Sequence, residues 1–123
     1  MSPIILLLIV TSVTLSSLAQ ITLKHGMSGA LVQSALQQAW PTAAFAVMTN
    51  LFIIGGLALY ALGAMVWLVV LARVDVSMAY PFVALGFLLT MILAIFMLGE
   101  SVSLTRIIGT VLIAGGALLV ARS

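Results

Sequence analysis

The chain contains four long apolar segments, residues 4–23, 51–72, 77–98 and 106–121. Every charged residue lies at or near an end of one of these segments. A helix that crosses the ~30 Å hydrocarbon core of a membrane needs about 20 apolar residues, because each residue adds ~1.5 Å. In lipid, helices and closed barrels satisfy every backbone group, and runs of this length without alternation favour helices. The pattern therefore predicts an all-α membrane protein, with four transmembrane helices in a single domain over residues 1–123.

The first stretch allows a second interpretation, a cleaved secretory signal, because Ser17-Leu18-Ala19 resembles a small-x-small cleavage site. However, no Lys or Arg precedes the apolar stretch, and several Ser and Thr residues interrupt it. We therefore expect the first stretch to remain part of the protein as a helix.

The connection between the first two spans, residues 26–50, is long enough to hold structure of its own. Apolar residues recur on one side of residues 31–40, with Gln and Ser on the other, which predicts a short amphipathic helix. We expect this helix to lie at the membrane interface, anchored by Trp40 before Pro41. Residues 42–50 either belong to the connection or lengthen the second span.

Composition supports the membrane prediction and excludes several classes of function. Of 123 residues, 65% are hydrophobic and 5% charged, and the mean hydropathy is +1.44, whereas about a quarter of the residues of a soluble domain are charged. Scattered cations do not form the basic patch that a nucleic acid requires. The sequence has no cysteine, and its lone His25 cannot supply a metal site. With no phosphate loop or nucleophile–base pair, we expect neither enzymatic activity nor a bound metal or cofactor.

The charges also bear on orientation and on partners. Alternating spans place Arg73 and Arg122 on the side of the N-terminus and Lys24 and Arg106 on the other, so the positive-inside bias is close to zero. Such a chain could insert in both orientations and pair with itself, and four helices are few to enclose a substrate path. We therefore expect a homodimer of opposite orientations, unless a partner protein or the N-terminal amine fixes a single orientation.

The first span carries a polar ladder, in which residues spaced by four share one helix face: Ser12, Ser16, Gln20 and Lys24. Contact of this face with acyl chains would be costly, so we expect it to face protein or a water-lined cavity. The ladder either binds substrate or joins helices through hydrogen bonds worth roughly 0.6 kcal/mol each. For Lys24 we favour binding of a phosphate or other anionic head group, although a cation here also suits the membrane interface.

The second and third spans hold further candidates for substrate binding. Tyr80, which precedes Pro81 at the start of the third span, suits a cavity mouth or an interfacial aromatic belt. Glu100 closes the same span on the side of Lys24. Tyr60 is a candidate on the second span, although such aromatics more often belong to a core or belt. No acidic residue lies inside a span, which argues against proton-coupled antiport.

Three motifs resemble the drug/metabolite transporter superfamily in its four-helix, small multidrug resistance-like (EamA-like) form: Ala79-Tyr80-Pro81, Leu98-Gly99-Glu100 and the glycine-rich stretch 108–116. Within the last motif, the fourth-helix dimerisation pattern of those transporters is matched by Gly109, Leu112, Ile113 and Gly116. The resemblance implies that these residues lie at a dimer interface, where small side chains let helices approach closely.

Two positions depart from the pattern of the members that export cationic drugs. The position of their essential first-helix glutamate, eight residues before a lysine, is Ser16 here, and Val83 replaces a tryptophan expected after Tyr80. The chain is more similar to the four-helix subunits that flip undecaprenyl-phosphate-linked aminoarabinose across the bacterial inner membrane. This resemblance implies translocation of a polyprenyl-phosphate sugar, with Lys24 holding the phosphate while the other ladder residues and Tyr80 meet the sugar.

In the aminoarabinose system two different subunits pair, so a heterodimer with a related four-helix subunit stands beside the homodimer as an expectation. Two alternative functions remain open: export of a small polar metabolite or drug through the same fold, and a structural or regulatory role within a larger membrane complex. The polar ladder disfavours the second alternative, since a scaffold has no need of Lys24 near Gln20.

Overall fold

The computed structural model describes residues 2–123, which form helices and short connections without a β-strand. Within these residues, four helical segments are long and apolar enough to cross a membrane. They are α1 (Pro3–Met27), α4 (Leu51–Leu71), the combined segment Val76–Met97, and α7 (Leu104–Arg122). The combined segment consists of α5 (Val76–Ala79), the 3-10 turn η1 (Tyr80–Phe82) and α6 (Val83–Met97). The predicted fold class is confirmed, and α1 continues to Met27, past its predicted end at residue 23.

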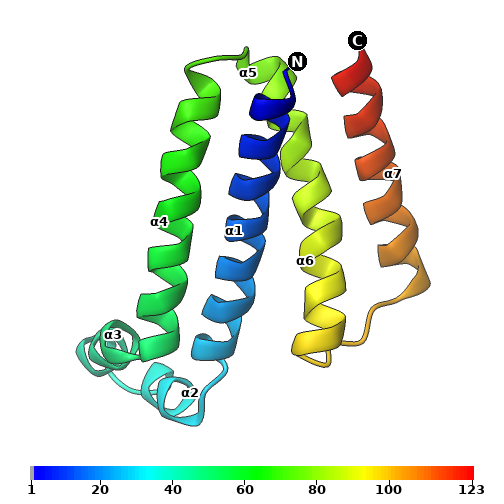
Figure 1. Ribbon diagram of the computed structural model, residues 1–123. Coiled ribbons are helices and arrows are strands. Elements are labelled where there is room, and N and C mark those ends of the chain that lie inside the picture. Colours follow the sequence, from blue (N-terminus) through cyan, green and yellow to red (C-terminus); the bar gives the residue numbers. More distant parts are fainter. Residues whose placement is uncertain (1) are drawn as a thin grey trace.

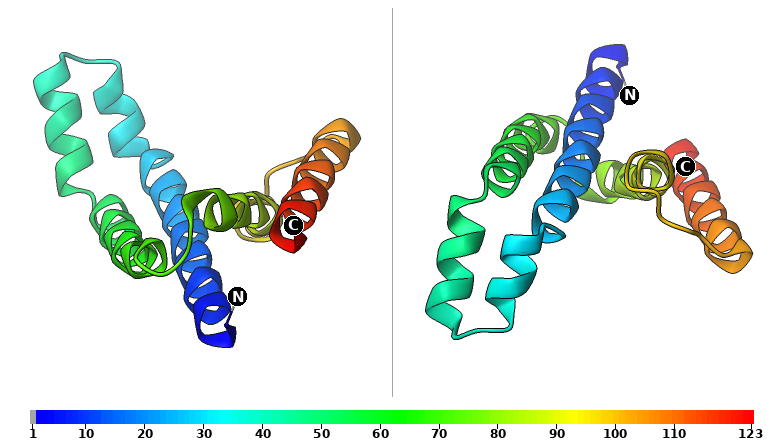
Figure 2. Two further views of the ribbon diagram at one scale, coloured as in Figure 1. Left: turned by 90° about the horizontal axis from the view of Figure 1, so that it is seen from above. Right: turned by 90° about the horizontal axis from the view of Figure 1, so that it is seen from below.

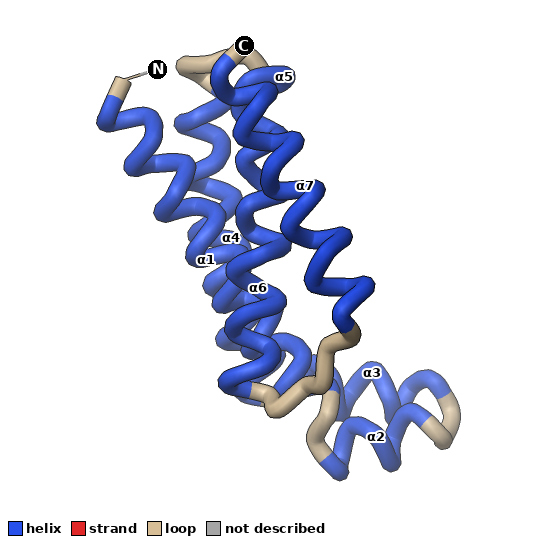
Figure 3. The backbone as a smooth tube through the Cα atoms, turned by 90° about the vertical axis from the view of Figure 1, so that its right-hand side faces the viewer, coloured by secondary structure: helices blue, strands red, loops and turns tan. Residues whose placement is uncertain are grey.

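The long helices stand side by side in the order α4, α1, α6, α7, which differs from their order in the chain (Figures 1 and 2). α1 packs against both α4 and α6, whereas α7 packs against α6 and η1. Both ends of the described chain lie at one end of the bundle (Figure 1), and the non-helical connections gather at its two ends (Figure 3). α1 therefore separates α4 from α6, and both of its flanks are covered.

Glycines of α4 and α6 lie where these helices approach α1 most closely. A Cβ atom on Gly56 of α4 would lie 2.8 Å from Leu23 Cγ, and one on Gly86 of α6 would lie 2.9 Å from Val13 Cγ1. Because lipid provides no hydrophobic drive between helices, close backbone approach at small residues supplies the packing energy. These glycines therefore hold α1 between its neighbours.

Two serine hydroxyls of α1 add one hydrogen bond to each flank. Ser12 Oγ donates to the Gly63 carbonyl of α4 at 2.8 Å, and Ser17 Oγ donates to the Gly86 carbonyl of α6 at 3.3 Å. Both serines are buried. The ladder residue Ser12 thus joins helices, which is one of the two roles that the sequence left open.

The connection between α1 and α4 contains two short helices, and the prediction of one helix over residues 31–40 is wrong. α2 (Ala30–Leu36) and α3 (Trp40–Thr49) form a helical hairpin that projects sideways from one end of the bundle (Figure 2). The backbone is extended at Ala39, with φ −61° and ψ 148°, and this ends the helical run. Trp40 consequently begins α3 instead of closing the amphipathic helix.

The residues before the second span do not lengthen it. Asn50 is extended, with φ −76° and ψ 124°, and separates α3 from α4. Its side-chain oxygen accepts hydrogen bonds from the backbone N–H groups of Phe52 at 3.0 Å and Ile53 at 3.1 Å. This N-cap satisfies donors that would otherwise be unpaired at a helix start. Residues 42–50 therefore belong to the connection, which is one of the two interpretations that the sequence left open.

Candidate substrate pocket

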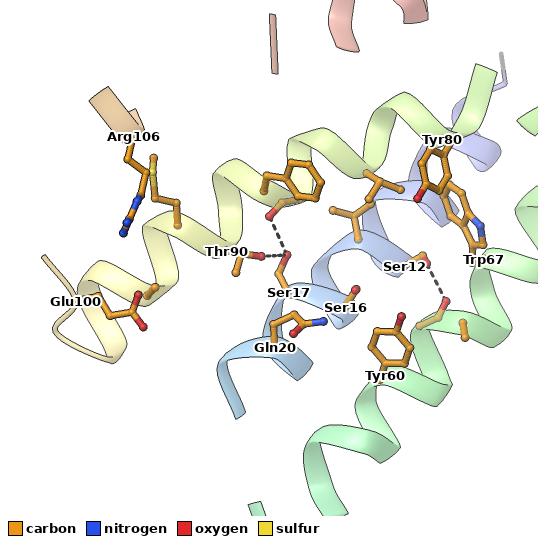
Figure 4. Close-up of a pocket in the computed structure, with 18 of the residues that line it drawn as sticks. Ser12, Ser16, Ser17, Gln20, Tyr60, Trp67, Tyr80, Thr90, Glu100 and Arg106 are labelled. Carbon is orange, nitrogen blue, oxygen red and sulfur yellow. Dashed lines mark hydrogen bonds between the residues drawn. The ribbon is translucent and has the colours of Figure 1, made fainter. Parts of the chain in front are cut away.

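A cavity of ≈ 700 Å³ lies over α1 between α4 and α6 and continues to the first turn of α7. This volume falls within the range of about 300–1,000 Å³ found for small-molecule sites. Side chains from each of the long helices meet here although they are far apart in the sequence (Figure 4). The lining residues with polar or aromatic side chains are Ser12, Ser16, Ser17, Gln20, Tyr60, Trp67, Tyr80, Phe87, Thr90, Glu100 and Arg106.

Most of the predicted substrate-binding residues come together at this cavity: Ser12, Ser16, Gln20, Tyr60, Tyr80 and Glu100. Lys24 is exposed and does not line it. The reason is helical geometry, because each step of four residues advances about 40° around a helix of 3.6 residues per turn. From Ser12 to Lys24 the ladder turns by about 120°, so its ends face different directions.

The polar groups of the pocket fall into two sets. In the first set, hydrogen bonds within the chain engage Ser12, Ser17 and Thr90, whose Oγ1 donates to Ser17 Oγ at 3.0 Å. Among the residues drawn in Figure 4, no hydrogen bond engages the side chains of the second set, which is Ser16, Gln20, Tyr60, Tyr80, Glu100 and Arg106. The first set shapes the pocket, and the second set presents donors and acceptors to a ligand.

The charged and aromatic groups lie at opposite ends of the pocket. Glu100 and Arg106 come from the loop after α6 and the first turn of α7, whereas Tyr80 and Trp67 lie together at the other end (Figure 4). An elongated ligand with an ionic group at one end fits such a distribution. Within residues 2–123, no group of three or more His, Cys, Asp or Glu side chains could hold a metal ion.

Five polar or aromatic pocket residues were absent from the predicted binding set: Ser17, Trp67, Phe87, Thr90 and Arg106. Thr90 follows Gly86 by four residues on α6, so their helical spacing placed both on one face. Arg106 was interpreted from the sequence as a charge at the end of a span. Its position beside the pocket depends on how α7 packs on α6, which no local pattern in the sequence reveals.

The four predicted dimer residues lie on a face of α7 that the rest of the chain leaves uncovered. Leu112 and Ile113 are 70% and 49% exposed, and a Cβ atom on Gly109 or Gly116 would meet no other atom within 4 Å. Their spacing of three and four residues puts them on one face of the helix. α7 instead buries Ala114 and Ala117, which lie on a different side.

Comparison with known proteins finds relatives that share one name, probable 4-amino-4-deoxy-L-arabinose-phosphoundecaprenol flippase subunit ArnE. The relative from Pseudomonas fluorescens is 41% identical over 68 residues, which are 54% of this chain and 60% of the relative. The relative from Pseudomonas aeruginosa is 42% identical over 62 residues, which are 50% of this chain and 54% of the relative. The relative from Pseudomonas syringae pv. syringae is 31% identical over 97 residues, which are 76% of this chain and 88% of the relative.

The extent of these matches differs among the relatives. The matched segment spans little more than half the length of the first two, but most of the length of the third. No family model matches the chain, and no solved structure matches it. The names of these relatives describe subunits of a flippase and not enzymes.

Proposed function

Since the chain belongs to the family of the probable 4-amino-4-deoxy-L-arabinose-phosphoundecaprenol flippase subunits named ArnE, we propose that it is a flippase subunit that moves a polyprenyl-phosphate-linked sugar of the aminoarabinose type across the bacterial inner membrane. The observation that carries this proposal is the pocket between α4 and α6, whose free polar groups lie among helices apolar enough to span a membrane. A polar site among membrane-spanning helices gives a hydrophilic head group a path through the hydrocarbon core.

The middle of the pocket suits the sugar. Ser16, Gln20 and Tyr60 offer hydroxyl and amide groups that can replace the water bound to sugar hydroxyls. Tyr80 and Trp67 add aromatic faces with one polar edge each, which suit ligands that have both apolar and polar surfaces. The polyprenyl tail would remain in the lipid, so the pocket has to hold the head group alone.

A second subunit would complete the pocket. Tyr80 and Phe87 line it and are exposed in the single chain, so one copy covers the ligand incompletely. The open stripe of Gly109, Leu112, Ile113 and Gly116 on α7 supports contact with another transmembrane helix, because small residues permit close approach. The partner is a second copy in the opposite orientation or a related four-helix subunit.

Reconstitution in lipid vesicles tests the proposal. The subunit, together with any partner that co-purifies, is placed in vesicles containing undecaprenyl phosphate linked to 4-amino-4-deoxyarabinose. A reagent that labels amines but does not cross the membrane should react with the lipid of the outer leaflet in empty vesicles, and with nearly all of it when the protein is present. Gln20→Ala should slow this reaction about tenfold, as expected for losing roughly 1–2 kcal/mol of hydrogen bonding.

Gln38→Ala provides a matched control, because Gln38 is exposed in the α2–α3 connection away from the pocket. The lipid-flipping proposal fails if the wild-type protein with its partner leaves the inner-leaflet lipid unlabelled. Release of a trapped small polar solute such as free aminoarabinose under the same conditions would instead favour the metabolite exporter.

A further inference from the structure

The pocket has a charged mouth that the polar ladder did not predict. Among the residues lining the pocket, the charges belong to Glu100 and Arg106. They belong to the connection between α6 and α7 and to the start of α7, at the bundle end that also carries the α2–α3 hairpin (Figure 1). A head group that enters from this end meets these two side chains before it reaches Gln20 or Tyr60 (Figure 4).

The backbone on both sides of the mouth is held by helix caps. Gly99 turns the chain after α6 with a φ of +68°, a conformation that suits glycine, and the Glu100 N–H then donates to the Ala94 carbonyl at 3.2 Å. At the start of α7, the Ser103 hydroxyl accepts a hydrogen bond from the Arg106 N–H at 3.2 Å. Both charged residues therefore project from fixed positions, although they lie beside a loop.

The two side chains offer complementary charges to one ligand. Figure 4 shows them at the same end of the pocket, and no hydrogen bond joins them among the residues drawn there. The Arg106 guanidinium presents a planar fork of donors that matches two oxygens of a phosphate. The Glu100 carboxylate accepts hydrogen bonds and attracts an ammonium group.

We propose that Arg106 binds the phosphate of the lipid-linked substrate and that Glu100 binds the ammonium group of its sugar, so that the mouth selects head groups carrying both charges. This inference rests on the proposed function and assigns the phosphate to a different cation from Lys24, which lies outside the pocket. A polyprenyl phosphate without the amino sugar can still pair with Arg106, but it brings its anion near Glu100 without an ammonium group to pair with that carboxylate. The mouth therefore discriminates against the carrier lipid that has lost its sugar.

Lipid binding to the purified subunit, with its partner if one co-purifies, tests the inference. The two probes are undecaprenyl phosphate with and without 4-amino-4-deoxyarabinose, measured by native mass spectrometry. Arg106→Gln should weaken binding of both lipids by about tenfold or more, because it removes a charge-assisted pair. Glu100→Gln should weaken binding of the amino-sugar lipid by a similar factor while leaving or strengthening binding of plain undecaprenyl phosphate.

Control variants show whether these losses are specific to the two charges at the mouth. Arg122→Gln removes an exposed arginine at the far end of α7 and should change neither affinity. A larger loss with Lys24→Gln than with Arg106→Gln would overturn the assignment of the phosphate. Equal effects of Glu100→Gln on both lipids would overturn the assignment of the ammonium group.

Competition by inorganic phosphate distinguishes a lipid head group from a free anion. Millimolar inorganic phosphate should not displace the amino-sugar lipid, and displacement would indicate a site for soluble phosphate, against the inference. If the wild-type protein binds and flips the amino-sugar lipid while the Arg106 and Glu100 variants behave normally, the inference fails alone. If the wild-type protein binds neither lipid, the proposed function fails with it.

Discussion

α1 and α7 are both apolar helices of membrane-spanning length, yet the chain packs them in opposite ways. Around α1 the neighbouring glycines leave no room for a methyl group, as at Gly56, where an added Cβ atom would lie 2.8 Å from Leu23 Cγ. On α7, a Cβ atom on Gly109 or Gly116 would meet nothing within 4 Å. Glycines around α1 are thus used for packing within the chain, whereas those on α7 remain available to a second chain.

The largest effect should follow from filling the close contact between α1 and α4. Gly56→Ala should lower the free energy of unfolding by about 1–3 kcal/mol, because the new methyl group would meet the Leu23 side chain and its backbone nitrogen at 3.1 Å. Reversible unfolding in mixed detergent micelles measures this change. Gly55→Ala is the matched control, since a Cβ atom there has no atom within 4 Å. Equal losses of unfolding free energy in both variants would contradict a specific close contact between α1 and α4 at Gly56.

A second, smaller effect should appear between chains when the open face of α7 is blocked. Gly116→Leu should weaken subunit association about tenfold, or roughly 1.4 kcal/mol, without changing unfolding of the single chain. Energy transfer between labelled subunits on dilution into detergent measures the association. Gly115→Leu adds the same side chain on another side of α7, where space is also open, and should leave association intact. Loss of association in both variants would argue against a specific interface on this stripe.

The smallest effect should come from a single hydroxyl on α1. Ser12→Ala removes the 2.8 Å hydrogen bond to the Gly63 carbonyl and should cost roughly 0.6 kcal/mol of unfolding free energy. Ser16→Ala, one turn further along the same helix, removes a hydroxyl that lines the pocket without a hydrogen bond in Figure 4, and should leave the unfolding free energy unchanged. If Ser16→Ala and Ser12→Ala lower the unfolding free energy equally, the Ser12–Gly63 hydrogen bond does not account for the loss in Ser12→Ala.

The sequence predicts the membrane helices well because the bilayer imposes their length on the apolar pattern. It fails in the connection after α1, where hydropathy is uninformative and local capping decides where helices start. α4 begins at Leu51, the residue at which the second apolar segment starts, because Asn50 directly precedes this run and asparagine is a favoured N-cap residue. The break at Ala39 has no comparably strong signal, apart from the proline two residues later.

The pocket is harder to predict than the helices that form it. When helices are apolar on all sides, the hydropathy pattern does not indicate which helices pack against each other. The order α4, α1, α6, α7 therefore cannot be derived from hydropathy. The ladder predicted the middle of the pocket, Ser16 and Gln20, but its rotation around α1 moves Lys24 away. Arg106 reaches the pocket through the packing of α7 on α6, which is a contact between separate elements that no local pattern reveals.

The position of α1 has a consequence for how the chain assembles during synthesis. This helix is made before α4 and α6, so the carbonyl acceptors of Ser12 and Ser17, which belong to Gly63 and Gly86, are made later. Until then, a serine hydroxyl in a membrane helix can bond to a carbonyl four residues earlier in its own helix. The arrival of α4 and then of α6 exchanges these bonds one flank at a time. The growing chain thus packs two later helices on both flanks of α1, while α7, which follows them, stays at the edge.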